Sequence, residues 1–174
     1  DPLQPTTEPV QPTEMLAIRQ AFVGAADAVV SGEDVLPGKV NYFIGNDKDK
    51  WKSGIPTYAG VKYTGLYEGV DVRYSGKQGV LTYEYTMAPG ISPAAIVSAF
   101  EGIDALTVAE DGSLSMETAF GTIGAQRPSA YQLISGQRLP VTVNYLLKDD
   151  LSFGFTVGSV NEDYPLVITN ADVR

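Results

Sequence analysis

The segment from Gly69 to Gly90 most constrains the fold of this chain, because it alternates between apolar and polar residues for its whole length. Its letters are GVDVRYSGKQGVLTYEYTMAPG. A period of two with many β-branched and aromatic residues predicts two strands, and SGKQG between them predicts a tight turn. Such a hairpin has one apolar face and one hydrated face, which is typical of an antiparallel sheet. The apolar face is predicted to carry Val70, Val72, Tyr74, Leu81, Tyr83, Tyr85 and Met87.

The rest of the chain repeats this pattern in shorter pieces. Turn residues recur every 8–12 positions between short apolar runs, which is typical of a β-sandwich. We therefore expect an all-β fold, an antiparallel two-sheet sandwich of short strands and hairpins. A length of 174 residues suits one domain over 14–174, and the Pro-rich residues 1–13 are expected to form a linker or tail.

Individual segments give finer expectations. Residues 14–23 are interpreted as a strand, with a helix as the alternative. Val29-Val30 and Val40–Ile44 are predicted as separate strands divided by a turn at Pro37-Gly38, and Leu139–Leu147 as one alternating strand. Ser92-Pro93 predicts a short helical turn, and Asp111-Gly112 predicts a hairpin turn.

Charge and missing residue types narrow the function. The net charge is −9 with scattered basic residues, which disfavours nucleic acids and anionic membranes as partners. The chain has no Cys and no His, so thiol nucleophiles, Ser-His-Asp triads and most zinc sites are excluded. No apolar run is long enough to cross a bilayer as a helix. These features favour a binding or structural role, and we expect no cofactor.

Several phrases in order carry a resemblance to a known family. They are LPGKVNYFIGNDKDKW, IPTYAGVKYTGLYEGVDVRYSGKQGVLTYEYTMAPG, IVSAFEGIDALTVAEDGSL, RPSAYQ and YPLVI. Over about residues 16–168 the chain resembles an uncharacterised all-β domain found near the N-terminus of large bacterial and archaeal surface proteins. That domain often precedes β-propeller-type (SBBP) repeats.

The resemblance implies an exported, extracellular or cell-surface module without known catalysis, and it supplies no catalytic residue. Two features depart from the family pattern. The family typically closes with Leu-Val-Ile-Asp-Pro, whereas Thr169-Asn170 follow Ile168 here, and propeller repeats are absent from these 174 residues. We expect either a fragment of a longer surface protein or a family member used alone.

Calcium is the one metal to consider. Asp47 and Asp49, with the carbonyl groups of Gly45-Asn46, could offer oxygen ligands in a turn. The spaced calcium-loop signature with its closing Glu is missing, so the alternative is that Asp47 caps a turn and Asp49 is solvated.

Aromatic residues are dense between positions 42 and 85. They could form a platform for sugars or for a protein partner, and Trp51 is the best candidate for an exposed anchor because it lies in the polar segment KDKWKSG. The alternative is cross-strand packing in the core. The candidate ligand or partner residues are Tyr42, Trp51, Tyr58, Tyr63 and Tyr67.

The sequence also contains a candidate carboxylate pair on the predicted hairpin. Asp71 and Glu84 fall on the hydrated face of the predicted hairpin near Arg73, where a solvated surface with an ion pair is the expected arrangement. A glycosidase pair would need two close carboxyl groups in a cleft, one with a raised pKa. We expect no catalysis here.

Three functional interpretations follow. The first is a non-catalytic surface module for attachment or assembly, whose partners are other subunits or domains of the same surface protein. Its sharper form is a filament subunit that adds a strand such as Met15–Val23 to a neighbour's sheet edge. The second is a carbohydrate-binding module that recognises glycans, and the third is the carboxylate hydrolase.

Overall fold

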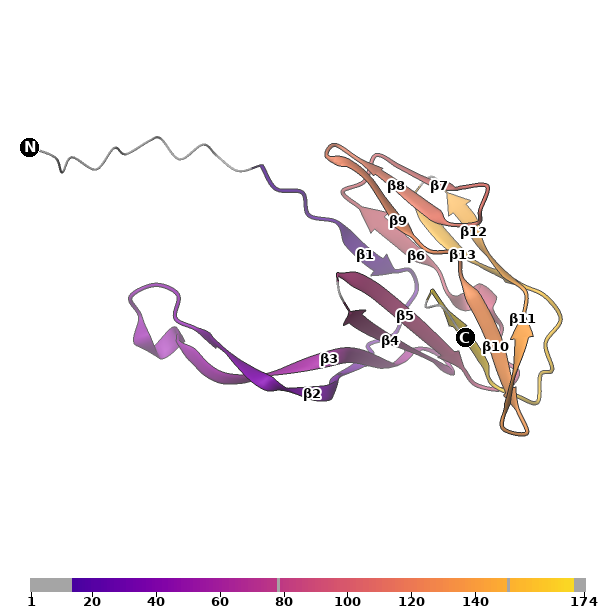
Figure 1. Ribbon diagram of the computed structural model, residues 1–174, viewed down its shortest axis with the longest axis horizontal. Helices are drawn as coiled ribbons and strands as arrows, with labels where there is room; N and C mark the ends of the chain where they lie inside the picture. The colour runs from indigo at the N-terminus through magenta and orange to yellow at the C-terminus, as the bar shows by residue number, and fades with distance from the viewer. Residues whose placement is uncertain (1–13, 78, 150, 171–174) are drawn as a thin grey trace, which may run out of the picture.

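The residues that the computed structural model describes form fourteen antiparallel strands and two short 3₁₀ helices (Figure 1), so the all-β prediction is confirmed. The structure describes residues 14–77, 79–149 and 151–170. The predicted linker at 1–13 lies outside them. Within these residues, no helix is long and apolar enough to span a membrane.

Three sheets are formed. The strands of the four-stranded sheet are, in spatial order, β1 (Arg19–Phe22), β6 (Ser98–Glu101), β13 (Ser152–Val157) and β12 (Val143–Asp149). The seven-stranded sheet runs in the order β11 (Gln137–Val141), β10 (Ser129–Ile134), β14 (Leu166–Thr169), β5 (Val80–Met87), β4 (Val70–Lys77), β3 (Lys52–Tyr67) and β2 (Val29–Tyr42). The small sheet contains β7 (Ala105–Val108), β8 (Leu114–Thr118) and β9 (Gly121–Ala125).

Aromatic rings fill the space between the two larger sheets. Tyr83 and Tyr85 of β5 face Phe155 of β13, with ring centres 6.2 and 5.8 Å apart. The ring centre of Tyr145 of β12 lies 5.3 Å from that of Phe153 and 5.7 Å from that of Phe155. Buried aliphatic side chains of β4, β5 and β14 complete this core, and Leu106, Leu114 and Met116 join it from the small sheet. All three sheets thus contribute side chains to one core, and this shared core holds the sandwich together.

The predicted central hairpin is confirmed as β4 and β5, paired from Val70↔Met87 to Lys77↔Val80. Val70, Val72, Tyr83, Tyr85 and Met87 are buried as its alternation predicts, and Tyr74 is partly buried against the same core. Leu81 was expected on the same face but is 63% exposed. It lies near the end of the hairpin, where it lines the rim of a cleft instead of the core.

Three local predictions agree with the structure. The strand expected within 14–23 is β1, which pairs with β6 of the same chain. Ser92 caps the 3₁₀ helix η2 (Pro93–Ala95), and Asp111-Gly112 turns between β7 and β8, so both predicted turns are confirmed. Both kinds of turn have local causes, which makes them visible in sequence.

Two segment predictions are wrong. Pro37-Gly38 does not end a strand, because β2 continues through it with a register shift between Val35 and Lys39. A bulge tolerates proline, which has no amide hydrogen to donate to the ladder. Leu139–Leu147 is two strands, because at Thr142 the chain leaves β11 in one sheet for β12 in the other. Alternation cannot reveal this crossing, since both strands alternate.

Candidate functional site

A long hairpin of β2 and β3 projects from the body of the protein (Figure 1). β2 is the last strand of the seven-stranded sheet, so the outer edge of the hairpin is open. Pairing between β3 and β4 runs from Tyr67↔Val70 to Gly60↔Ser75, and the eight residues of β3 from Lys52 to 59 lie beyond it. At about 3.3 Å per residue, this extension reaches roughly 25 Å. We call residues 34–59 the arm.

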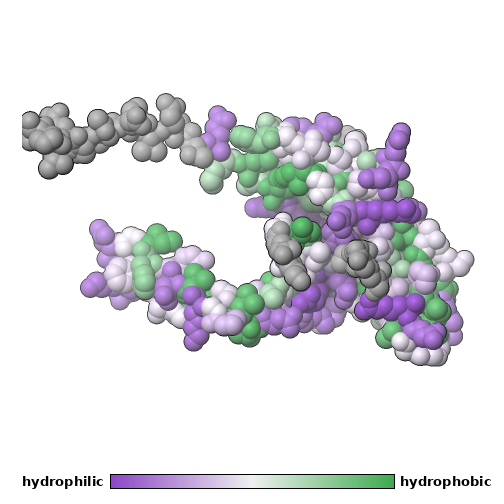
Figure 2. Space-filling model, in the orientation of Figure 1, coloured by the Kyte–Doolittle hydropathy of each residue, from purple (hydrophilic) through white to green (hydrophobic). Residues whose placement is uncertain are grey.

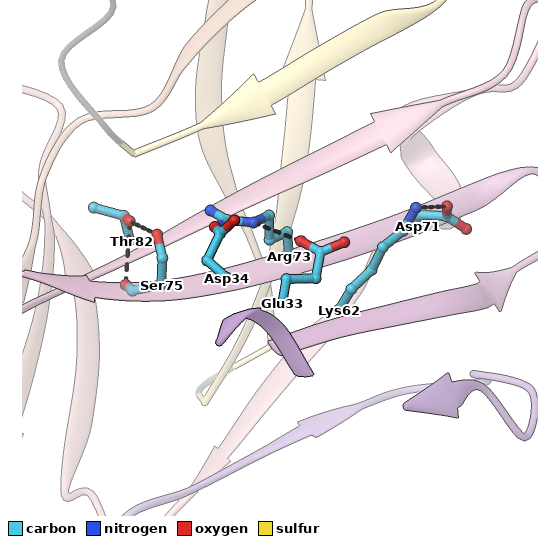
Figure 3. Close-up of polar contacts among 7 residues, drawn as sticks. All are labelled: Glu33, Asp34, Lys62, Asp71, Arg73, Ser75 and Thr82. Carbon is cyan, nitrogen blue, oxygen red and sulfur yellow. Dashed lines mark hydrogen bonds and ion pairs between the residues drawn. The ribbon is translucent and has the colours of Figure 1, made fainter. Parts of the chain in front are cut away.

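Ion pairs hold the arm to the body at its base (Figure 3). Arg73 of β4 donates from Nε to Glu33 and from Nη2 to Asp34, each at 2.8 Å. Gly60 leaves room for this guanidinium, because a Cβ atom there would approach Arg73 Nη2 to 2.8 Å. Beside it, Lys62 Nζ lies 2.9 Å from Asp71. Charged contacts therefore add to the β3–β4 ladder in fixing the base of the arm.

Replacing Arg73 is expected to loosen the base of the arm without unfolding the body. In the Arg73→Met variant, Glu33 and Asp34 lose their shared cation, and partly exposed pairs are typically worth up to about 1 kcal/mol. We expect amide hydrogens of β2 near Val35 to exchange about three- to fivefold faster, with β5 unchanged. Native-state hydrogen exchange measures this, and Arg138→Met on β11 is the control. Unchanged exchange in β2 would contradict the role of Arg73.

The tip of the arm is ordered by contacts among its own residues. Trp51 Nε1 donates to the Gly45 carbonyl at 3.1 Å, and the rings of Trp51 and Phe43 meet edge to face with centres 5.2 Å apart. Asp47 caps the 3₁₀ helix η1 (Lys48–Lys50) by accepting from the Asp49 amide. The tip is thus a small folded cap on which Phe43 and Ile44 remain 58% and 76% exposed.

The predicted calcium ligands lie in this cap. Asp47 accepts from the Asp49 amide at 3.1 Å and pairs with Lys50 at 3.4 Å, while Asp49 is exposed. Among the described residues, no three acidic side chains gather as a metal site would need. The arrangement matches the turn-capping alternative, and calcium binding stays a prediction.

The five candidate aromatic residues do not form one row. Tyr42, Trp51 and Tyr58 lie on the arm and are 52%, 36% and 41% exposed. Tyr63 instead packs against the rings of Phe22 and Tyr74, and Tyr67 is buried, with its hydroxyl donating to the Val97 carbonyl. An exposed role for Tyr67 is therefore wrong. The sequence could not separate these residues, because whether each ring is covered depends on segments that are distant in the sequence.

The carboxylate candidates lie on the sheet surface. Burial alone would raise the pKa of Asp71, but the Gly65 amide and Lys62 together lower it below its ordinary value. A lowered pKa opposes the role of a general acid. Glu84 lies opposite Arg73 in the strand register, on a neighbouring strand.

Sequence reasoning missed the most distinctive property of the arm, which is its exposed apolar surface, part of which is visible in Figure 2. Of the 23 large hydrophobic side chains that are exposed in the described residues, eight lie in the arm and three more, Val29, Val30 and Val61, lie at its base. The eight in the arm are Val35, Leu36, Val40, Tyr42, Phe43, Ile44, Trp51 and Tyr58. Adjacent apolar pairs in the sequence were the available signal, but a strand buried on both faces gives the same signal.

A second feature is an apolar cleft of about 350 Å³ in the body. It lies where the end of the β4–β5 hairpin meets the small sheet and the four-stranded sheet. Its floor includes Tyr83, Tyr145 and Phe153, and its rim includes Leu81 and Ile123, which are 63% and 45% exposed. The hydroxyls of Tyr83 and Tyr145 bond each other at 2.8 Å, and Tyr145 also donates to the Gln126 carbonyl. The cleft therefore suits an apolar group.

The sequence was compared with family models, and one of them matches residues 2–169. Its description is a domain of unknown function, DUF7948. The chain belongs to the DUF7948 family. The match covers nearly all of the β-domain, so the predicted membership in an uncharacterised domain family is confirmed. Searches of curated proteins and of solved structures find no match to this DUF7948 chain.

Proposed function

We propose that this DUF7948 domain is a non-catalytic module of an extracellular or cell-surface protein, and that it attaches to other protein through its arm. The observation that carries the proposal is the projecting arm with its many exposed apolar side chains. A two-stranded hairpin alone is marginally stable in water. Large exposed apolar patches on soluble proteins mark interaction sites. The partners are other subunits or domains of the same surface protein.

Ring geometry favours a protein over a glycan as the arm's ligand. Phe43 and Trp51 meet at an interplanar angle of 65°, so they present an edge and a face, not one flat platform. The arm's aliphatic side chains add exposed apolar area, and they are Val35, Leu36, Val40 and Ile44. Hydroxyl groups of a sugar covered by this area would have no hydrogen-bond partners.

Labelling on intact producing cells tests both parts of this proposal. The chain has no native cysteine, so single substitutions I44C on the arm and L133C on β10 give specific reactive sites. Both side chains are exposed, at 76% and 48%. With a maleimide that cannot cross membranes, we expect L133C to react on intact cells and I44C to be protected about tenfold. The two variants should react alike after purification in dilute solution.

Two results would contradict the proposal separately. If L133C reacts only after lysis, the domain is not at the cell surface. If I44C reacts on intact cells as fast as L133C, the arm is not covered by a partner. The purified variants also control for folding, because circular dichroism should match the unmodified protein.

A further inference from the structure

The arm and the apolar cleft are complementary, and they lie on separate parts of one chain. Resting on the proposed function, we propose that the tip of the arm of one copy inserts into the cleft of a second copy. The inserted group is Phe43 with Ile44, supported by Trp51. The receiving surface is the cleft with Leu81 and Ile123 at its rim. The partner of the arm is therefore this same domain.

Size supports this pairing. An engineered cavity of about 150 Å³ accepts one benzene molecule, so a cleft of about 350 Å³ has room for roughly two groups of that size. Phe43 and Ile44 are adjacent in sequence and highly exposed, so they can enter together. The polar groups of the cleft floor already bond one another, so an apolar side chain leaves none of them unpaired.

Charge distribution also supports tip-to-body contact. Residues 39–52 contain four of the chain's 12 basic residues and two of its 21 acidic residues. The tip is therefore positive, whereas the remainder of the chain is strongly negative. Two bodies repel each other, and so do two tips, but a tip and a body attract. This asymmetry favours a tip meeting a body over a symmetric contact between two arms.

The arm's direction explains why the partner is a second copy. The arm leads away from the body, and its tip lies far from the sandwich (Figure 1). β2 and β3 pair as far as Tyr42↔Lys52, with two register shifts, so folding the tip back onto its own body would have to bend this ladder sharply. A contact between two different surfaces is heterologous, and it generates rings or open filaments. The expected assembly is thus a head-to-tail series of domains.

Complementation between two variants tests the proposal. I44E disables the tip, and L81E disables the cleft; both side chains are exposed, so folding should be unaffected. Multi-angle light scattering should show concentration-dependent assembly of the unmodified protein and monomers for each variant. An equal mixture should form heterodimers and nothing larger, because only one functional tip and one functional cleft remain. We expect the dissociation constant of each single variant to rise more than tenfold.

Matched controls and a crosslink define the surfaces. L133E carries the same change on β10, outside the cleft, and should assemble like the unmodified protein. A mixture of I44C and I123C should form a disulfide between the two chains under oxidation, since no other cysteine is present. Little crosslinking is expected when L133C replaces I123C.

The outcomes separate this inference from the proposed function. If the unmodified domain remains monomeric at millimolar concentration, the second copy is not the partner, and the labelling experiment on cells still decides whether the arm is an interface. If I44E and V35E both prevent assembly while L81E assembles normally, the arms bind each other through β2, and the cleft inference is wrong. Assembly of all variants alike would also overturn it.

Discussion

Raising the pH above 10 is expected to unfold this domain through its buried tyrosines. Burial raises the pKa of Tyr74 and of Tyr145 to about 12 each, and it raises the pKa of Tyr83 and Tyr85 as well. In the unfolded chain these phenols lose their protons near pH 10. The folded state therefore holds more protons than the unfolded state above pH 10, and its stability falls as the pH rises.

The expected loss is large. The contribution of each group is fully present below pH 10 and declines by about 1.4 kcal/mol per pH unit until the folded pKa is reached. Four such groups together remove about 5.6 kcal/mol at pH 11, which approaches the whole stability of many domains. Circular dichroism and phenolate absorbance, followed together from pH 8 to 12, should change in one coupled transition.

A variant with fewer buried phenols provides the control. Tyr83→Phe combined with Tyr145→Phe removes two of the four groups, and both hydroxyls of the 2.8 Å bond are removed together. In this double variant, the loss of stability per pH unit should be about half of that in the unmodified domain. Phenolate absorbance that rises fully at pH 10 while the sheet signal persists would show that these tyrosines titrate freely in the folded state.

Local rules predicted much of the fold. Alternation placed Val70, Val72, Tyr85 and Met87 correctly in the core, because each strand contacts the core with every second residue. Turns at Asp111-Gly112 and Ser92-Pro93 were predictable, since their hydrogen bonds form between neighbours in sequence. Where a strand's partner lies far along the chain, the sequence carried no equivalent signal.

The arm could not be predicted for that reason. Whether Val35 and Leu36 are buried or exposed depends on whether another layer covers β2, and no local pattern encodes that layer. The same limit applies to the cleft, whose residues come from strands throughout the chain. Of the aromatic residues that the sequence predicted to bind a ligand, only those on the arm are exposed. Aliphatic Ile44, the most exposed hydrophobic residue of the arm, was overlooked.

Truncating Phe155 is expected to destabilise the domain far more than Arg73→Met or Phe120→Ala. Its ring is 3% exposed and contacts the rings of Tyr83, Tyr85, Tyr145 and Phe153 at 5.7–6.2 Å. Phe155→Ala should therefore lower the free energy of unfolding by about 3–5 kcal/mol, through lost burial and the cavity left between the sheets. Urea unfolding, followed by circular dichroism, measures this loss.

Phe120→Ala is the matched control, because Phe120 is 60% exposed beside the small sheet, and a change within about 0.5 kcal/mol is expected. If Phe155→Ala does not fold, Phe155→Leu keeps most of the volume and should show a smaller loss. Equal effects of Phe155→Ala and Phe120→Ala would contradict the assigned core.

Tyr83, Tyr145 and Phe153 also form the cleft floor, so Phe155→Ala should weaken assembly by deforming the cleft. Substitutions at the rim, such as L81E, alter the cleft without removing any part of this core.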